Sequence, residues 1–381
     1  MRRGNPRTIL IANPGADLYG SDRMALETVR ALVADGRRVV VTVPQPGPLV
    51  PLLEQAGAEV VECLTPIVRK GLLSPRGLAE LAGTTLRSIG PGLRLIRETD
   101  AGVVIVNTIT PPLWLALGRL RGRMTVCHVH EGEASVSSVL RRALYVPLLF
   151  SSRILINSEF SLRVLARSAP WLVRRTTVVY NAVAGPPRVV AARAELTEPI
   201  RLVYVGRLSA RKGPHVAIEA AKLLADAGRN VHLSLLGAAF AGNEAYAESL
   251  AELVARSALA ERVTFLGFKP SVWDDLGAND IVLIPSTVDE PFGNTAVEAA
   301  LAGRPAVVSR VGGLPEAAAR SRSAVLVPPD DAAALAAAVG DIADDWARFS
   351  ALAAADAVDV AEAFSHEQYA RGIRDALNLP S

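Results

Sequence analysis

The sequence predicts an α/β protein made of two similar domains, each with a parallel β-sheet. Short apolar runs typical of strands alternate with amphipathic helical stretches along the whole chain. Strands separated by helices favour a parallel sheet that is covered on both faces. The alternation is interrupted once, near the middle, by a proline-containing stretch, so we expect two domains joined by a linker.

The first domain is predicted from the N-terminal half of the chain. Thr8–Ala12 is predicted to be the first strand, and Asp22–Asp35 the first helix, because its apolar residues recur at helical spacing. Leu49–Gln55 lies between the second predicted strand, Arg38–Val43, and the third, Glu59–Cys63. Further strands are predicted at Arg38–Val43, Glu59–Cys63, Val103–Asn107, Met124–His130, Arg153–Asn157 and Thr177–Tyr180.

Ala182–Pro199 has neither strand nor helix character and contains Gly185-Pro186-Pro187, so it is predicted to be the linker. We therefore expect domains at 1–187 and 188–362. In the second domain, strands are predicted at Arg201–Val205, Val231–Leu236, Val263–Leu266, Ile281–Pro285 and Ala306–Ser309, with helices at Pro214–Ala227, Glu244–Ser257 and Asn294–Ala302.

Composition excludes several classes of protein. Half of the 381 residues are hydrophobic and 21% are charged, which is typical of a globular chain. No run of 18 apolar residues and no signal peptide is found, and two cysteines cannot form a disulfide framework. We therefore expect a cytoplasmic protein.

The charges are distributed unevenly between the two halves of the chain. Residues 1–187 hold 23 Lys+Arg against 13 Asp+Glu, whereas the remainder holds 18 Lys+Arg against 25 Asp+Glu. The first half therefore either meets something anionic or has a solvated basic surface.

A first candidate site follows the strand Arg201–Val205. Gly206 is followed by Arg207 and Lys212 before a helix begins near Pro214. A glycine allows an anion to approach the backbone, and the helix N-terminus adds a positive dipole end. Arg207 can hold a phosphate with two hydrogen bonds, while Lys212 supplies a compact charge. A basic loop without a ligand is the alternative.

A second candidate site, Asp289–Glu298, follows the strand Ile281–Pro285. Gly293, Asn294 and Thr295 open a helix whose free N–H groups can bind phosphate oxygens. Glu290 and Glu298 bracket this turn. The two carboxylates could hold a polar ligand between them. The alternative is that Glu290 is a helix-dipole partner and Glu298 a surface glutamate.

These motifs together resemble the family 4 glycosyltransferases of the GT-B fold. The resemblance is carried by Gly206-Arg207-Leu208 with Lys212-Gly213, by Glu290-Pro291-Phe292-Gly293 with Glu298, and by Val311-Gly312-Gly313-Leu314-Pro315-Glu316. It covers nearly the whole chain but is specific only in the second half. It implies two Rossmann-like α/β/α domains that face a central cleft, with a last helix (363–381) that returns to the N-terminal, acceptor-binding domain.

The resemblance also implies roles for residues of the second half. Arg207 and Lys212 would neutralise the diphosphate of a nucleotide-sugar donor, Glu290 would hold the sugar, and Glu298 the ribose. Val263–Phe268 would line the nucleobase pocket. The donor-binding set is then Gly206, Arg207, Lys212, Phe268, Glu290, Phe292, Gly293, Asn294, Thr295 and Glu298.

On the acceptor side, the resemblance places a glycine-rich loop after the first strand. The matching stretch has Tyr19-Gly20-Ser21 in place of the usual Gly-Gly pair. His128 and His130 end a later strand and share one face. The family often has a His–acidic pair there, so the acceptor-side set is Gly20, Ser21, His128, His130 and Glu131, and the catalytic set is His130, Glu290, Arg207 and Lys212.

The sequence contains no Asp-x-Asp triplet, the carboxylate pair that usually holds a divalent cation on a nucleotide sugar. No third ligand accompanies the two histidines, so we expect no metal and no cofactor. Cations and a helix N-terminus would stabilise the leaving diphosphate. The resemblance implies retention of configuration.

The acceptor is open: a cell-envelope or lipid-linked glycan, or a small molecule. Ile67–Arg97 interleaves Arg69, Lys70, Arg76, Arg87, Arg94 and Arg97 with leucines. This segment is either a pair of surface helices or a contact with anionic lipid at the inner face of a membrane. The donor nucleotide is UDP, GDP or dTDP. A nucleotide-sugar 2-epimerase of the same fold is the alternative function; a nucleic-acid partner is not expected, because aromatics are only 5%.

Overall fold

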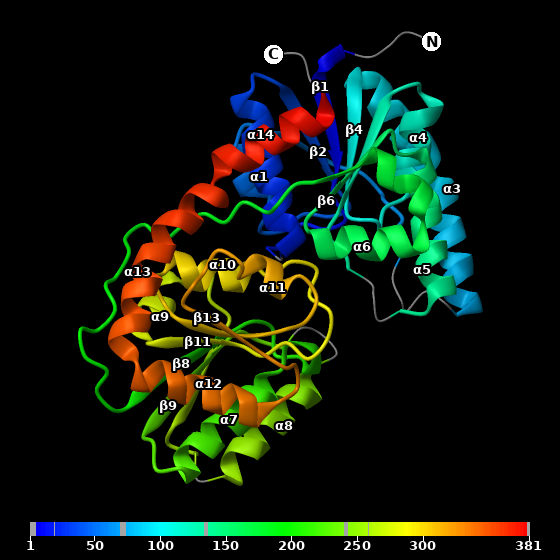
Figure 1. Cartoon of the computed structure of the whole chain (residues 1–381). Helices are drawn as coiled ribbons and strands as arrows, with labels where there is room; N and C mark the ends of the chain where they lie inside the picture. Colours follow the sequence, from blue (N-terminus) through cyan, green and yellow to red (C-terminus); the bar gives the residue numbers. More distant parts are fainter. Residues whose placement is uncertain are drawn as a thin grey trace. The chain divides into compact units, whose positions relative to one another are not determined.

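The computed structural model describes residues 5–18, 20–68, 74–132, 136–239, 243–257 and 259–378. The chain forms two compact units (Figure 1). Unit 1 comprises Met1–Ala182 and His366–Ser381, and unit 2 comprises Val183–Ser365. Each unit is a parallel sheet with helices on both faces, as the alternating pattern predicts.

Unit 1 contains a seven-stranded parallel sheet in the order β3-β2-β1-β4-β5-β6-β7. Growth of the sheet reverses direction between β1 and β4, which is the switch point where ligands of such sheets bind. The central strands are buried on both faces, which explains their continuous apolar runs. The strands are β1 (Asn5–Ala12), β2 (Arg38–Val43), β3 (Glu59–Glu62), β4 (Ala101–Asn107), β5 (Met124–Val129), β6 (Arg153–Ile156) and β7 (Thr176–Val178).

Two apolar clusters cover the faces of this sheet. On one face, α1, α2 and α14 pack against β1, β2 and β4. On the other, α3, α4, α5 and α6 supply the buried side chains. The helices are α1 (Gly20–Ala34), α2 (Val50–Gln55), α3 (Pro75–Glu98), α4 (Leu113–Leu120), α5 (Ser138–Tyr145), α6 (Glu159–Ser168) and α14 (His366–Leu377), with 3-10 helices η2 (Val146–Phe150) and η3 (Pro170–Arg175).

The expected return of the last helix to the first unit is confirmed. Tyr369 of α14 is buried, and its hydroxyl lies 2.6 Å from Thr28 Oγ1 of α1. His366 Nδ1 lies 2.7 Å from Glu27 Oε2 at the start of the same contact.

Unit 2 repeats the same strand order with six strands, β10-β9-β8-β11-β12-β13, so its switch point lies between β8 and β11. Residues 185–199, before its first strand, contain no helix or strand, as expected of the predicted linker. The strands are β8 (Ile200–Val205), β9 (Val231–Leu236), β10 (Val263–Gly267), β11 (Ile281–Ile284), β12 (Ala306–Ser309) and β13 (Ala324–Val327).

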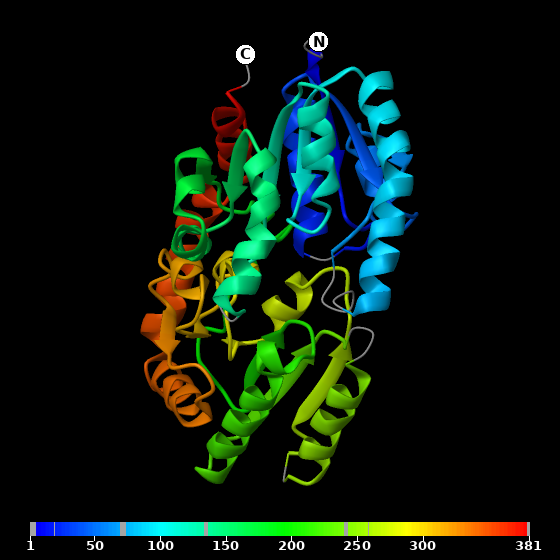
Figure 2. The ribbon, with the colours of Figure 1, turned by 90° about the vertical axis from the view of Figure 1, so that its right-hand side faces the viewer.

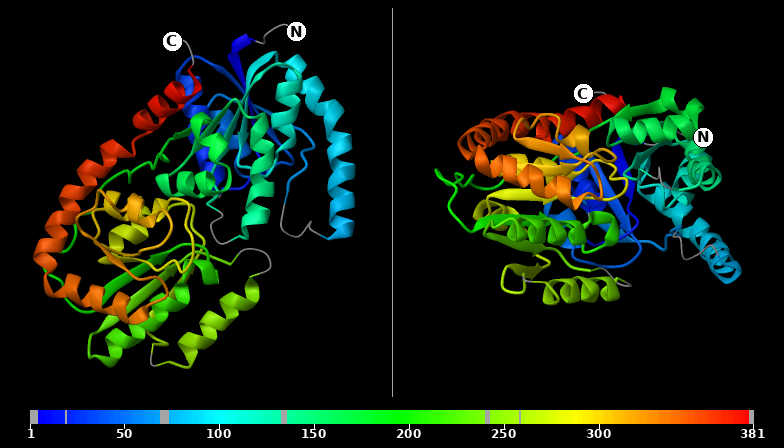
Figure 3. Two further views of the ribbon diagram at one scale, coloured as in Figure 1. Left: turned by 45° about the vertical axis from the view of Figure 1, so that its right-hand side comes forward. Right: turned by 60° about the horizontal axis from the view of Figure 1, so that its bottom comes forward.

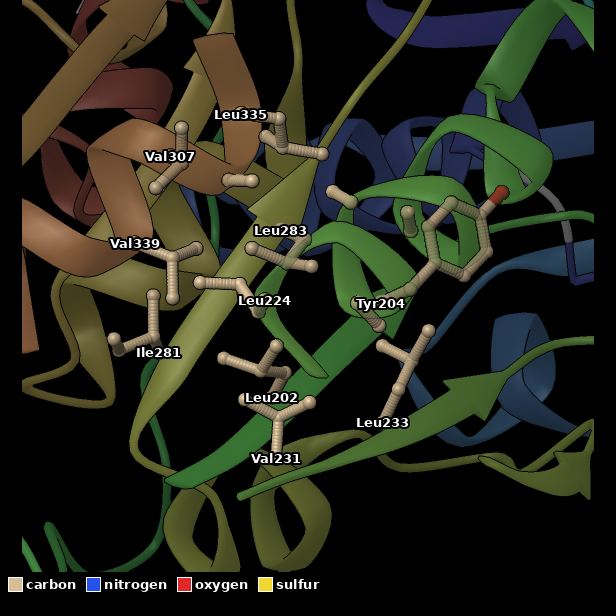
Figure 4. Packing of buried hydrophobic residues seen from close by; sticks show 14 of the residues in the cluster. Leu202, Tyr204, Leu224, Val231, Leu233, Ile281, Leu283, Val307, Leu335 and Val339 are labelled. Atoms are coloured by element: carbon tan, nitrogen blue, oxygen red, sulfur yellow. The ribbon is translucent and has the colours of Figure 1, made fainter. Parts of the chain in front are cut away.

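Helices α7, α8 and α12 cover one face of this sheet, and α9, α10, α11 and α13 cover the other. Helices α7 and α12 lie side by side (Figure 3). Side chains of β8, β9 and β11 converge with Leu224 of α7 and Leu335 of α12 (Figure 4). The helices are α7 (Pro214–Asp226), α8 (Glu244–Ala255), α9 (Trp273–Ala278), α10 (Asn294–Leu301), α11 (Leu314–Ala317), α12 (Ala332–Asp344) and α13 (Trp346–Ala363), with the 3-10 helix η4 (Ala210–Lys212).

Two details differ from the sequence-based expectation. Helix α1 begins at Gly20, so Gly20 and Ser21 belong to its first turn and not to a preceding loop. Where the structure describes the segment 67–97, at 67–68 and 74–97, it has one helix in place of the expected pair of surface helices: α3, with 24 residues, continues through Pro91 (Figure 2). Gly92 of that helix packs tightly on Leu117, so contact with α4 supports the helix beyond the proline. Arg69, Lys70, Leu72 and Leu73 lie outside the described residues.

Among the helices that the structure describes, none has both the length and the apolar character needed to span a bilayer.

Candidate active site

Two loops of unit 2 meet at the carboxyl ends of β8 and β11. The loop at 206–213 follows β8, and the loop at 285–293 follows β11. Thr287 joins them, because its backbone N–H donates to Arg211 O at 3.0 Å and its hydroxyl donates to Ala210 O at 3.1 Å. The two motifs that the sequence singled out are therefore neighbours.

Glycines allow these loops to come so close. Gly213 has a φ of +69°, and a Cβ atom built there would lie 1.9 Å from Pro285 O. Gly312, in the loop after β12, has a φ of +62°, and its Cβ would lie 2.3 Å from Glu290 O. Gly313 N donates to the same carbonyl at 2.7 Å. The backbone around Glu290 is thus held between two neighbouring loops.

Lys212 and Glu290 form an ion pair where the loops meet. Lys212 Nζ lies 2.7 Å from Glu290 Oε2, and Arg211 Nη2 lies 3.7 Å from the same oxygen. Burial acts to raise the pKa of Glu290, but the nearby charges of Lys212 and Arg211 outweigh it, and the pKa is lowered. The carboxylate is therefore ionised at neutral pH, and its ion pair fixes the position of the lysine ammonium.

A small pocket brings several predicted residues together. Its lining includes Lys212, Gly293 and Thr295, together with Tyr204, Val205, Ile284, Pro285, Ser286 and Leu314. Gly293 precedes helix α10, and Thr295 lies in the first turn, where backbone N–H groups have no partner within the helix. The pocket thus places a lysine ammonium beside a helix N-terminus, an arrangement that attracts an anion.

The other predicted donor residues differ in position. Arg207 is exposed, and its carbonyl accepts a hydrogen bond from Tyr204 Oη at 2.8 Å. Phe268 is 59% exposed after β10 and does not line the pocket. Phe292 is buried, with its ring centroid 5.6 Å from that of Phe364, so its side chain supports the loop from the core. Gly206 N donates to Leu236 O of β9, which fixes the start of the loop. Asn294 and Glu298 lie on α10, half-buried.

In unit 1, the predicted acceptor-side residues gather beside the switch point. The register pairs Asn107, the last residue of β4, with His128 of β5. The rings of His128 and His130 have centroids 4.1 Å apart, so they share a face as predicted. Glu131 Oε2 accepts a hydrogen bond from His130 N at 3.0 Å.

Both histidines are neutral. Burial lowers the pKa of His130 to about 3. Burial, with the neighbouring His130, also lowers the pKa of His128 far below its usual value. His128 is buried, and its Nε2 atom has no hydrogen-bond partner among the described residues. Those residues also contain no cluster of three His, Cys, Asp or Glu that could hold a metal ion.

Sequence reasoning missed residues in both units. Arg211 contacts Glu290, although only its neighbours were chosen. In unit 1, His130 Nε2 lies 2.8 Å from Asn107 Oδ1, and the amide of Asn107 reaches Asn13. The signal that could have found the two asparagines is an asparagine at the carboxyl end of an apolar strand: Asn13 directly follows β1, and Asn107 is the last residue of β4.

Comparison with known proteins agrees with the motifs. Residues 188–356 match the family model of "Glycosyl transferases group 1", and residues 19–184 match that of "Glycosyltransferase Family 4". The glycogen synthase of Mycobacterium tuberculosis is 35% identical over 171 residues, which is 44% of this chain and 40% of that protein. The D-inositol 3-phosphate glycosyltransferase of Mycolicibacterium vanbaalenii is 35% identical over 231 residues, 56% of this chain and 50% of that protein.

The chain therefore spans about half the length, or less, of these curated relatives. Among solved structures, Anabaena HepE in complex with UDP and glucose superposes with a TM-score of 0.80 at 22% identity, covering 97% of this chain and 99% of that one. That likeness shows the fold. With both halves matched by models of one enzyme group and the motifs in place at the switch point, the chain belongs to the family 4 glycosyltransferases of the GT-B fold.

Proposed function

We propose that this protein transfers a hexose from a nucleotide-diphosphate sugar to a hydroxyl group of an acceptor, with retention of configuration. The observation that carries this proposal is the pocket of unit 2, where Lys212 meets the N-terminus of α10. A cation and a helix N-terminus together suit a phosphate group, which is the part that all such donors share. Glu290, 2.7 Å from Lys212, can bind hydroxyl groups of the sugar beside that phosphate.

A uridine nucleotide is the first donor to test. Its support is the fold-level likeness to HepE, which has been solved with UDP-glucose. GDP- and dTDP-sugars are the other candidates. Phe268, exposed after β10, belongs to the segment proposed to contact the base.

Transfer is proposed to proceed without a metal ion or other cofactor. Lys212, Arg207 and the N–H groups at the start of α10 would stabilise the charge on the departing diphosphate, as preorganised donors do in a site of low polarity. The acceptor hydroxyl would attack from the face that the diphosphate leaves, and the diphosphate would take its proton. The sugar would keep its anomeric configuration.

The acceptor is proposed to be a sugar or a lipid-linked glycan, bound by unit 1. Helix α3 supports a contact with an anionic membrane, because it exposes Leu78 and Leu86 (51% and 72%) together with Arg76 and Arg87. Apolar and basic side chains on one exposed helix suit a lipid surface at the inner face of a membrane. Sedimentation with anionic vesicles at low salt tests this contact; a protein that stays in the supernatant would remove it.

A donor screen tests the central proposal. Thermal unfolding is measured with UDP-, GDP- and dTDP-sugars, and one nucleotide class is expected to raise Tm, since a ligand that binds only the folded state stabilises it. Lys212→Ala should abolish the shift, whereas Lys222→Ala, a matched change at an exposed lysine paired with Asp226, should retain it. Stabilisation by none of the three classes would overturn the proposal.

Turnover decides the reaction. Donor consumption should require an acceptor, and the product should keep the anomeric configuration of the donor sugar by NMR. Consumption of the donor without any acceptor would indicate an epimerase in place of a transferase.

A further inference from the structure

A chain of hydrogen bonds runs from α1 to His130 through two asparagine side chains. Asn13 Nδ2 donates to Gly15 O at 2.8 Å and to Asp22 Oδ1 at 3.1 Å. Asn107 Nδ2 donates to Asn13 Oδ1 at 2.6 Å and to Ser21 O at 3.0 Å. Asn107 Oδ1 then lies 2.8 Å from His130 Nε2.

The backbone carbonyls in this chain fix the orientation of both amides. A carbonyl can only accept a hydrogen bond, so each amide nitrogen must face its carbonyl, of Gly15 or of Ser21. If the amide of Asn107 were turned over, its oxygen would face two other oxygens with no hydrogen between them. The oxygen of Asn107 must therefore point at His130, and His130 Nε2 must carry the hydrogen.

The turn that presents Asn107 is itself specified. Thr108, the next residue, has a φ of +70°, a conformation that costs a β-branched residue about 1–3 kcal/mol. Its N–H donates to His128 O at 2.8 Å, and its hydroxyl lies 2.6 Å from Thr110 Oγ1. The end of β4 is thereby tied to β5, which brings the amide of Asn107 to the imidazole of His130.

We propose that Asn107 is a positioning residue that holds His130 as its Nε2–H tautomer, so that Nδ1 offers a lone pair to a hydroxyl group of the substrate. Asn13, which is itself held by Gly15 O and Asp22 Oδ1, and the carbonyl of Ser21 hold Asn107 in turn. The role given to the substrate rests on the proposed function, whereas the tautomer does not.

The remaining nitrogen is available for this role. His130 is half-buried, and Nδ1 makes no hydrogen bond to the residues that the structure describes. Some buried side-chain nitrogen and oxygen atoms of the described residues have no hydrogen-bond partner, and Nδ1 of His130 is not among these buried atoms. The neutral ring has one hydrogen, and the hydrogen bond to Asn107 Oδ1 places it on Nε2, so Nδ1 has none at neutral pH. The site therefore selects a group that donates a hydrogen bond, which a sugar hydroxyl can do and an ether or deoxy position cannot.

Nitrogen-15 NMR of the histidine-labelled full-length protein tests the tautomer directly. The chain has five histidines, and His130→Gln assigns the signal of His130. In the wild type near pH 7, two-bond proton–nitrogen correlations should show a protonated Nε2 and a bare Nδ1. A dominant Nδ1–H form would overturn the proposal, whatever the enzyme does.

Two variants separate positioning from general damage. Asn107→Leu removes the acceptor, so His130 should become a mixture of tautomers. Asn13→Ala leaves Asn107 and His130 intact but removes the anchor of the amide, and the preference should weaken. Asn157→Ala is the matched control, because Asn157 is also a buried asparagine directly after a strand and lies outside the chain of hydrogen bonds. Its tautomer signal should match the wild type.

A third variant keeps the acceptor and changes its charge. Asn107→Asp keeps one oxygen toward Nε2–H but turns its second oxygen toward Asn13 Oδ1 and Ser21 O, where the amide nitrogen donated, so we expect a loss of stability. In the folded variant the carboxylate should raise the pKa of His130, because it stabilises the imidazolium. The titratable groups around His130 are His128 beside it on β5, Glu131 after that strand, Asp22 of α1 behind Asn107, and Tyr369 of α14, which stacks on His128. All of these are unchanged in this variant, and the one group added is the new carboxyl, so a new protonation step is assigned to the imidazole of His130 only if the ring nitrogen chemical shifts of His130 follow it.

Activity supplies the second readout. Asn107→Leu should lose roughly ten- to hundredfold in kcat/KM, as for other residues that orient a ligating side chain. Asn107→Asp should be impaired below the raised pKa, where Nδ1 carries a proton, and should recover above it. If the tautomer shifts as expected and the activity of every variant stays at the wild-type value, the role of Nδ1 toward the substrate is wrong while the proposed transferase activity stands. If neither the wild type nor any variant binds a donor, the proposed function is wrong, but the conclusion on the tautomer of His130 still holds.

Discussion

Units 1 and 2 have the same strand order around the point where the growth of the sheet reverses, and both place their candidate residues there. The chemistry differs. In unit 2 the two loops are joined by an ion pair, Lys212 with Glu290, beside a helix N-terminus. In unit 1 the same position is centred on the neutral imidazole of His130, bonded to the amide of Asn107, and the carboxylates there, Asp22 and Glu131, accept hydrogen bonds from an amide and a backbone N–H.

This difference suggests a division of work between two copies of one architecture. A charged site with a helix N-terminus suits a phosphate, whose negative charge needs neutralising. A neutral site of amides and imidazoles suits hydroxyl groups, which need directed hydrogen bonds and no net charge. Under the proposed function, one switch point would recognise an ion, and the other would recognise hydroxyl groups through hydrogen bonds.

Removing the cation of unit 2 should give the largest effect. Lys212→Ala should reduce kcat/KM by about 10²–10³-fold, since deleting one group that stabilises transition-state charge typically costs this much. Steady-state kinetics with the donor found by the screen measures it. Lys222→Ala is the control, and equal rates in the two variants would break the contrast between the units.

The sequence predicted much more of unit 2 than of unit 1 for a physical reason. Phosphate recognition demands charge and glycine, and residues such as Lys212 and Gly213 stand out in any loop. Asn13 and Asn107 are ordinary strand-end residues until pairing of β1 with β4 brings their amides within 2.6 Å. The residues next to Asn13 and Asn107 in the sequence do not indicate that the two side chains come this close.

The fold was predictable because its signal is local and repeated. Apolar strands and amphipathic helices alternate, and most strands could be located from their own residues, although β13 and the helices α4 and α6 were not located. The start of α1 was placed two residues late, at Asp22, and the continuity of α3 through Pro91 was missed because a contact outside that helix supports it. For α3, the deciding contact is Gly92 on Leu117 of α4.

Backbone geometry at the loop of unit 2 should give the next largest effect. Gly213→Ala adds a Cβ where Pro285 O would lie 1.9 Å away, in a residue with a φ of +69°. We expect it to lower the free energy of unfolding by about 3 kcal/mol. Gly228→Ala is the matched control, because its φ is +84° but no atom lies within 4 Å of the added Cβ.

The control isolates the cost of the dihedral angle, which should be roughly 1–2 kcal/mol. Urea denaturation measures both variants. If the two lose equal stability, the close approach of the loops does not constrain the site.

Acid should affect the two units differently through their carboxylates. The pKa of Glu290 is lowered in the folded protein, so its ion pairs stabilise the fold above its ordinary pKa of 4.5, and this contribution is lost as pH falls through the lowered value. The Tm difference between wild type and Glu290→Gln should stay constant near neutral pH and shrink in acid.

Glu59 of unit 1 also has a lowered pKa, first because of its hydrogen bond with Arg38, but this pair is about half exposed. Glu59→Gln should therefore cost less, and salt should remove its effect. A larger acid-dependent change for Glu59→Gln than for Glu290→Gln would reverse the comparison.

The smallest effect concerns how unit 1 is closed by the end of the chain. Tyr369 of α14 is buried and has its hydroxyl 2.6 Å from Thr28 of α1, while Thr28 also donates to Met24 O at 2.8 Å. Because Thr28 uses its hydrogen on that carbonyl, Tyr369 must be the donor between the two hydroxyls. Tyr369→Phe should then cost about 1 kcal/mol of unfolding free energy, the net value of one buried hydrogen bond. A double-mutant cycle with Thr28→Val should recover most of that cost as coupling energy, and independent costs would mean that the two hydroxyls do not bond.

Tyr369 also stacks on His128, with ring centroids 6.3 Å apart. Unchanged kcat/KM in Tyr369→Phe would therefore show that α14 supports the site of unit 1 through packing alone.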